Sequence, residues 1–185
     1  MKKGIMLAIL AACFLTGCQK PVNYIEEGTA FLEEGAYTDA AASFEKSLDA
    51  EEDAAEGYRG LGLVYYEQQE YQQAKEAFQK ALDNGGEAAP TTYNLMGICS
   101  MHLEDYDGAL QAFEQGIAAA SSYTEPEEGE EVPYAEVLQE MKYNEIVCYE
   151  KKLDWASAKA KIEEYIAQYP DDSEAQREAA FLRTR

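Results

Sequence analysis

The stretch YRGLGLVYYEQQEYQQAKEAFQKA, residues 58–81, decides the fold of this chain of 185 residues. Its second half contains the phrase Tyr-x-x-Ala-x-x-x-Phe, which occurs at residues 37–44, 71–78 and 106–113. The first two copies stand 34 residues apart and the next two stand 35 apart. A unit of this length is one helix-turn-helix, which must stack on its neighbours to bury its apolar face. The spacing therefore predicts a solenoid of helix pairs.

Small residues recur at fixed positions of these units. Gly62 lies on the first helix of the unit, and Ala74 lies on the returning helix. A glycine inside a helix costs about 1 kcal/mol relative to alanine, so its recurrence at one position indicates close packing there. Equivalent positions hold Gly28 and Gly97, and Ala40 and Ala109. We expect the two helices of each unit to approach closely, with Tyr and Phe filling the remaining space.

The full pattern is Tyr-x-x-Leu-Gly-x-x-Tyr, five residues, then Tyr-x-x-Ala-x-x-x-Phe-x-x-Ala, and it resembles the tetratricopeptide repeat. The resemblance implies an all-α fold, a right-handed superhelical solenoid of about four helix pairs with a C-terminal capping helix. The expected units are residues 22–53, 55–88, 90–123 and 134–170, and the capping helix is residues 171–185. The fourth unit departs from the pattern, because Glu145 and Ile146 replace Leu-Gly. In the first unit Glu27 replaces the Leu.

Two local features interrupt or end the array. Residues 121–133 contain five glutamates, two prolines and a glycine, which predicts an exposed acidic loop between the third and fourth units. Ser173, with Gln176 three residues later, predicts an N-cap and capping box for the last helix. That helix is expected to cover the open end of the solenoid.

The N-terminus predicts export. Two lysines precede the apolar segment 5–15, which is the layout of a secretory signal. The segment is shorter than the roughly 20 apolar residues that span a membrane. Its ending, Leu-Thr-Gly-Cys at residues 15–18, resembles the lipobox of bacterial lipoproteins. That resemblance implies removal of residues 1–17, acyl chains such as palmitate on Cys18, and a short lipidated tether at residues 18–21. The protein would then sit on the extracytoplasmic face of a bacterial membrane, or on the outer membrane of a two-membrane cell.

The net charge of the chain limits the classes of partner that we expect. The full chain has a net charge of −21, and loss of residues 1–17 leaves 13 basic against 36 acidic residues, or −23. Nucleic acid and anionic lipid surfaces would be repelled, so neither is an expected partner. Two interpretations of the charge remain open: solubility of an extended solenoid, or a cationic partner.

Cys99 and Cys148 remain after lipidation, and both occupy the position that holds Ala30 in the first unit and Val64 in the second. Equivalent positions of neighbouring helices lie roughly 8–10 Å apart, whereas a disulfide needs α-carbons within about 7 Å. We expect two buried thiols with no disulfide.

The resemblance also implies a ligand surface, because the first helix of each tetratricopeptide unit lines a concave groove. Carried over by register, the candidate groove residues are Arg59, Leu63, Tyr66, Asn94, Ile98, Met101, Tyr143 and Val147, preceded by Ile25, Thr29 and Leu32 and followed by Glu150. Such a surface suits an extended peptide or an amphipathic helix. Arg59 and Asn94 also resemble, with an incomplete basic set, the groups that hold a C-terminal carboxylate in some members of the family.

Enzymatic chemistry has little support. The chain has one histidine, His102, and neither a Cys-x-x-Cys nor a glycine-rich phosphate loop, so we expect no catalytic residues, cofactor, metal or small-molecule substrate. The expected function is a lipid-anchored scaffold for protein or peptide partners in an envelope, secretion or pilus assembly. Two alternatives remain: a self-associating structural lipoprotein, or a non-catalytic accessory to a cell-wall enzyme.

Overall fold

A computed structural model describes residues 22–122 and 134–185, and these residues form nine α-helices and no strand. The helices are α1 (Tyr24–Glu33), α2 (Tyr37–Asp49), α3 (Ala54–Glu67), α4 (Tyr71–Asp83), α5 (Pro90–His102), α6 (Tyr106–Ala120), α7 (Ala135–Lys151), α8 (Trp155–Gln168) and α9 (Ser173–Leu182). The signal segment, Cys18, the tether and most of the acidic loop lie outside the described residues. Within them, no helix is both long enough and apolar enough to cross a membrane.

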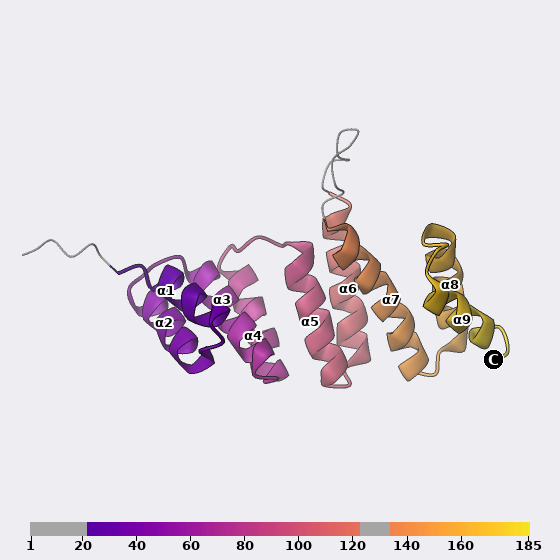
Figure 1. Ribbon diagram of the computed structural model, residues 1–185, viewed down its shortest axis with the longest axis horizontal. Coiled ribbons are helices and arrows are strands. Elements are labelled where there is room, and N and C mark those ends of the chain that lie inside the picture. The colour runs from indigo at the N-terminus through magenta and orange to yellow at the C-terminus, as the bar shows by residue number, and fades with distance from the viewer. Residues whose placement is uncertain (1–21, 123–133) are drawn as a thin grey trace, which may run out of the picture.

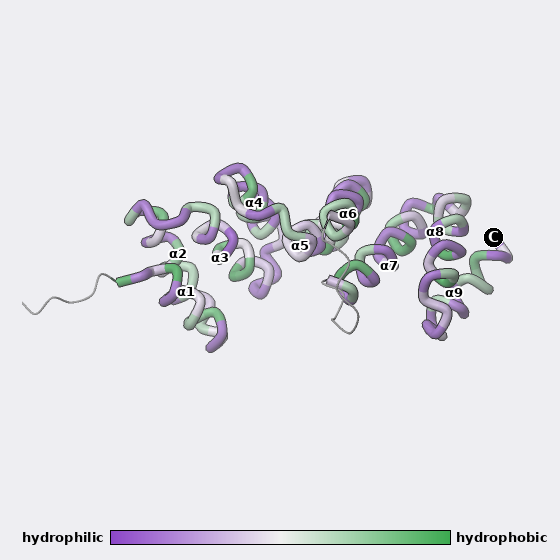
Figure 2. Tube along the Cα trace, turned by 90° about the horizontal axis from the view of Figure 1, so that it is seen from above, coloured by the Kyte–Doolittle hydropathy of each residue, from purple (hydrophilic) through white to green (hydrophobic). Residues whose placement is uncertain are grey.

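Consecutive helices pack as antiparallel pairs along one axis (Figure 1). We call α1–α2, α3–α4, α5–α6 and α7–α8 units one to four, and α9 packs on α8. Seen from above, α4, α6 and α8 lie along one side, while α3, α7 and α9 lie along the other (Figure 2). The predicted all-α solenoid of four helix pairs with a terminal helix is confirmed.

Each unit turns between its helices through one residue in the left-handed conformation. The φ angles are +72° at Gly35, +61° at Gln69, +59° at Glu104 and +59° at Leu153. In unit two the amide of Gln69 donates to the Tyr66 carbonyl, and the next amide donates to the Tyr65 carbonyl. This pair of bonds satisfies carbonyls that the helix end leaves free. The shared turn gives all four units the same register.

In units one to three a phenylalanine of the second helix lies against a glycine of the first. A Cβ built on Gly62 would lie 2.6 Å from the ring of Phe78, and one built on Gly97 would lie 2.3 Å from that of Phe113. In unit one a Cβ built on Gly28 would lie 2.9 Å from the ring of Phe44. The predicted close approach of the two helices is thus confirmed, and a side chain at these positions would displace a buried ring.

Unit four closes the same contact with different residues. Ile146 takes the glycine position, and Ile162 takes the phenylalanine position; both are 1% exposed and belong to one buried cluster. Beside them Glu145 is 6% exposed, and Lys161 Nζ donates to its Oε2 at 2.9 Å. The two departures seen in the sequence are therefore matched by partners on the returning helix.

Two predictions about single residues have opposite outcomes. The prediction for the cysteines is confirmed, because Cys99 and Cys148 are free and fully buried, and burial raises their thiol pKa values to about 11 and about 12. The predicted N-cap at Ser173 is wrong. Asp172 is extended, and its Oδ1 accepts from the amides of Glu174 and Ala175, so Ser173 is already the first helical residue.

Candidate functional site

The predicted groove residues all lie on the odd-numbered helices, from α1 to α7. We call the surface formed by these helices and α9 the odd-helix face. Two hollows open on it, on either side of α7. The first hollow, of about 350 Å³, is lined by Tyr66, Ile98, Met101, His102, Glu140 and Asn144. The second hollow, of about 300 Å³, is lined by Glu136, Gln139, Glu140, Tyr143, Tyr165, Asp172 and Glu174.

The first hollow brings together three of the predicted residues from two units. Tyr66 comes from the end of α3, and Ile98 and Met101 come from the last two turns of α5. Burial raises the pKa of Tyr66, and the negative charge of Glu140 adds to that effect. The hollow thus combines an apolar wall with one carboxylate on its rim.

An aromatic stack forms one border of the first hollow. The rings of Tyr71 and His102 are parallel, with centroids 4.0 Å apart, and Tyr66 meets Tyr71 edge-on at 6.2 Å. His102 is therefore held by a ring contact between units two and three. A rigid border of this kind favours binding, because little side-chain freedom remains to be lost.

Asn94 joins unit three to unit four beneath the same surface. Its side chain is buried, with 6% of the residue exposed, and its Nδ2 donates to Glu140 Oε2 at 2.8 Å. The other amide atom, Oδ1, has no hydrogen-bond partner among the described residues. Turning the amide over would point Oδ1 at the carboxylate, so Glu140 itself fixes this orientation. A buried acceptor is left open beside a carboxylate that borders both hollows.

The remaining predicted residues are more dispersed. Arg59 forms an ion pair with Glu56 at 2.5 Å and lines a separate hollow near the start of α5. Tyr143 lines the second hollow, whereas Leu63 packs into the cluster between units two and three. Neither Leu63 nor Val147 lines any of the four hollows described in this subsection.

A hydrogen-bonded chain supports the floor of the second hollow. Gln139 Nε2 donates to the hydroxyl of Tyr165 at 2.9 Å, and that hydroxyl donates to Asp172 Oδ2 at 2.8 Å. Burial raises the pKa of Tyr165 to about 12, so the phenol stays protonated and keeps donating. Asp172 also caps α9, which ties the terminal helix to unit four.

Glu150, at the far end of α7, adds an unusual carboxyl group to the odd-helix face. Burial is the main cause that raises its pKa to about 7, and a hydrogen bond with Glu178 of α9 adds to it. One of its oxygens is buried without a hydrogen-bond partner among the described residues. The Glu150 carboxyl group therefore keeps its proton to a higher pH than an exposed glutamate would.

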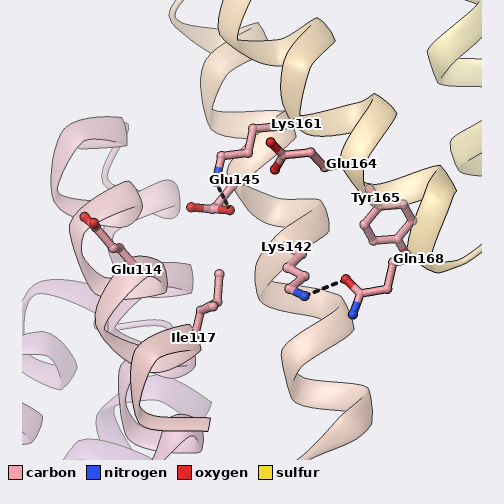
Figure 3. Close-up of a pocket in the computed structure, with 8 residues that line it drawn as sticks. All are labelled: Glu114, Ile117, Lys142, Glu145, Lys161, Glu164, Tyr165 and Gln168. Carbon is pink, nitrogen blue, oxygen red and sulfur yellow. Dashed lines mark hydrogen bonds and ion pairs between the residues drawn. The ribbon is translucent and has the colours of Figure 1, made fainter. Parts of the chain in front are cut away.

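A fourth hollow, of about 250 Å³, opens on the side of the even-numbered helices (Figure 3). Lys161 bonds Glu145 at 2.9 Å, and Lys142 Nζ donates to Gln168 Oε1 at 2.6 Å. Lys142 stands where unit three has Tyr93, and burial lowers its pKa. Both lysines already have hydrogen-bond partners within the chain. We therefore interpret this hollow as a result of the residues that replace the family pattern in unit four, and not as a ligand site.

Register reasoning missed the acidic part of the site. Glu140 and Asn144 line the first hollow although neither was a predicted groove residue. Glu140 lies three residues before Tyr143, on the same face of α7, so extending the predicted face by one helical turn would have found it. The bond to Asn94 spans 46 residues and has no sequence signal.

Comparison with known proteins agrees with the architecture. Models of the tetratricopeptide repeat match residues 25–91, 66–124 and 142–172. No match was found among curated protein sequences.

Several solved structures share the fold. YrrB, a TPR protein with an unusual peptide-binding site, superposes with a TM-score of 0.68 at 22% identity, over 86% of this chain and 74% of YrrB. MamA superposes with a TM-score of 0.69 at 18% identity, over 86% of this chain and 78% of MamA. At these identities the likeness concerns the fold alone.

Proposed function

Because the chain belongs to the tetratricopeptide repeat family, whose members are generally non-catalytic interaction scaffolds, we propose that its odd-helix face binds a segment of a partner protein. We further propose that Cys18 carries a lipid anchor that holds the scaffold on the extracytoplasmic face of a bacterial membrane. There it would serve an envelope, secretion or pilus assembly. The signal-like layout of residues 1–18 supports the anchor.

The single observation that carries the binding proposal is the first hollow. It collects Tyr66, Ile98 and Met101 from two units, and Glu140 and Asn144 of a third unit add polar groups to its wall. Concave sites with an apolar wall and a few placed polar groups are the usual form of ligand sites. YrrB, which has this fold, is described as having a peptide-binding site, and this supports a peptide as the ligand class.

Site-specific photo-crosslinking in intact cells tests the proposal. A photoreactive residue at Met101, on the odd-helix face, is expected to capture a partner protein. The same residue at Gln111, which is exposed on α6, is the matched control and should not. Capture at Gln111 but not at Met101 would contradict binding on the odd-helix face.

The lipid anchor needs a separate test. Metabolic labelling with an alkyne fatty acid is expected to mark the chain and to fail in the Cys18→Ala variant. Labelling that persists without Cys18 would contradict the anchor.

Self-association is a second candidate because both ends of the described chain expose apolar side chains. Val22 is 55% exposed before α1, and Phe181 is 43% exposed on α9. Sedimentation velocity decides between the two functions. A protein that stays monomeric at every concentration excludes self-association. An oligomer that dissociates in the Phe181→Ser variant supports it.

A further inference from the structure

We propose that the partner segment is rich in proline, has basic flanks and crosses α7 in the polyproline II conformation, with successive turns of the segment in the first and the second hollow. The inference rests on the proposed function, since it names the chemistry of the segment that the odd-helix face binds. Three observations carry it: the aromatic walls of the hollows, their unused hydrogen-bond donors, and their spacing. The charge of their rims accounts for the basic flanks.

Each of the two hollows has aromatic rings in its wall. Tyr66 and His102 line the first hollow, and both are held by ring contacts with Tyr71. In the second hollow Tyr143 meets Tyr165 edge-on, with ring centroids 5.5 Å apart. Proline-rich segments bind to grooves with aromatic walls, and their preformed conformation loses little freedom on binding. Rings that are held in place on both sides of α7 therefore suit such a segment.

The hollows also contain hydrogen-bond donors that the chain itself does not use. In the first hollow the side chains of Tyr66 and Asn144 form no hydrogen bond with any described residue. In the second hollow Gln139 Nε2 uses one of its two hydrogens to donate to Tyr165. Burial raises the pKa values of Tyr66 and Tyr143, so both hydroxyls keep their protons. A polyproline II segment has no internal hydrogen bonds, so its carbonyls are free to accept from these groups.

The spacing of the two hollows agrees with one turn of this conformation. The hollows lie on either side of α7, and packed helices are separated by roughly 8–10 Å. Polyproline II has three residues per turn and rises about 3.1 Å per residue, so equivalent residues recur about every 9 Å. A β-strand repeats each face about every 7 Å, and an α-helix bonds its own carbonyls. Polyproline II alone among these three places equivalent residues at both hollows and leaves its carbonyls free.

The charge of the rims favours basic residues beside the prolines. The two rims carry four carboxylates: Glu136, Glu140, Asp172 and Glu174. Neither hollow is lined by Lys or Arg within the part of the chain that the structure describes. An acidic segment would therefore be repelled, and Lys or Arg in the flanks would be attracted. This attraction is screened by salt, so it adds to the binding of the prolines and does not replace it.

Fluorescence anisotropy with three labelled peptides tests the inference on the full chain. The first peptide repeats Pro-Pro-Leu four times and has one Lys at each end. In the second peptide each Pro is replaced by Ala, and in the third peptide each Lys is replaced by Glu. We expect the first peptide to bind about tenfold more tightly than the second, because alanine loses both the ring contacts and the preformed conformation. The third peptide should bind about threefold more weakly than the first.

A matched pair of double variants tests the hydroxyl donors. Tyr66→Phe with Tyr143→Phe removes one hydroxyl from each hollow and keeps the aromatic rings. Tyr37→Phe with Tyr106→Phe makes the same change at the first residues of α2 and α6, away from the odd-helix face. The first double variant is expected to weaken binding of the proline peptide about tenfold, and the second by less than twofold.

Three outcomes would overturn the inference. The first is an alanine peptide that binds at least as tightly as the proline peptide, or no binding of either one. The second is an equal loss in the two double variants, which would show that the hydroxyls of the hollows make no contact. The third is a partner crosslinked at Met101 through a segment without proline, which would leave the proposed function in place. Failure of the proposed function looks different, because no partner would then be captured at Met101 at all.

Discussion

Units two and four have the same turn and the same helix pairing, but they fill the contact between their helices in opposite ways. Unit two places Gly62 against Phe78, whereas unit four places Ile146 and Ile162 at the same positions, sixteen residues apart in both cases. Unit two fills the contact with one large side chain opposite a glycine, whereas unit four fills it with two side chains of medium size. The comparison teaches that the fold depends on the volume shared by the two positions rather than on either residue.

The position just before the glycine shows a similar exchange, in which an apolar pair is replaced by a polar or charged pair. Unit two has Leu61 opposite Ala77, and unit four has Glu145 opposite Lys161, again sixteen residues apart. Unit one pairs Glu27 with Ser43, whose hydroxyl donates to the carboxylate at 2.9 Å. The first and fourth units therefore use a polar pair where the units between them use an apolar one.

Breaking the isoleucine contact should have the largest effect. Ile146→Gly removes a side chain that is 1% exposed and adds a flexible residue to α7. The loss in unfolding free energy is expected to be about 4 kcal/mol, measured by urea denaturation followed by circular dichroism. Adding Ile162→Phe rebuilds the arrangement of unit two and should recover at least half of that loss. A double variant no more stable than the single one would contradict a shared volume.

The reverse exchange in unit two should have the next largest effect. Gly62→Ile places a side chain where even a Cβ would lie 2.6 Å from the Phe78 ring, so a loss of about 3 kcal/mol is expected. Phe78→Ile alone should also destabilise, because it leaves a gap. Combined, the two changes should be less harmful than the sum of the single losses, as thermal denaturation of all three variants can show.

Removing one partner of the polar pair in unit four should have the third largest effect on stability. Lys161→Ala leaves the carboxylate of Glu145 buried without its cation, and we expect a loss of about 2 kcal/mol. Converting both positions to those of unit two, with Glu145→Leu and Lys161→Ala, should restore the stability or exceed it. A double variant that is less stable than the unmodified protein would show that the ion pair contributes more to stability than its apolar replacement.

The smallest expected effect concerns pH and the position that holds Tyr66 in unit two and Glu150 in unit four. The pKa of Glu150 is raised to about 7 from an ordinary 4.5, so the folded chain binds more protons than the unfolded chain between these values. Stability from this group is complete below pH 4.5 and is lost as the pH rises through 7. Glu150→Gln should therefore stabilise by about 1 kcal/mol at pH 8 and change little at pH 4, after allowance for solvent screening.

Thermal denaturation across this pH range checks the prediction. Glu76→Gln on α4 is the control, and it should leave the profile unchanged. An equal gain from Glu150→Gln at both pH values would contradict the role of its proton.

Much of the fold could be predicted from the sequence because the repeat reports equivalent positions directly. Register alone predicted the buried cysteines, the contact of Gly62 with its partner helix, and the face that carries Tyr66, Ile98 and Met101. It could not predict how Glu145 and Ile146 are accommodated, because their partners lie on the other helix and follow no family pattern.

The acidic half of the site was beyond the sequence for a related reason. The bond between Asn94 and Glu140 crosses from unit three to unit four over the segment where the register slips. Which carboxylate meets a given amide depends on how far two helices slide past each other, and periodicity does not specify that distance. The cap of α9 was missed more simply, because Asp172 and Ser173 are both good N-cap residues.

The pairing of helices with their chain neighbours also bears on how the protein folds. The main contacts between the described helices join neighbours in the chain or the next helix but one, as between α5 and α7. Chains with such local contacts fold quickly, since no long loop has to close first. Folding can begin in any unit and extend to the next, so the stability of each junction sets how far a partly folded chain extends. The Asn94–Glu140 bond lies at the junction of units three and four. A partner bound there would stabilise the contact between these two units.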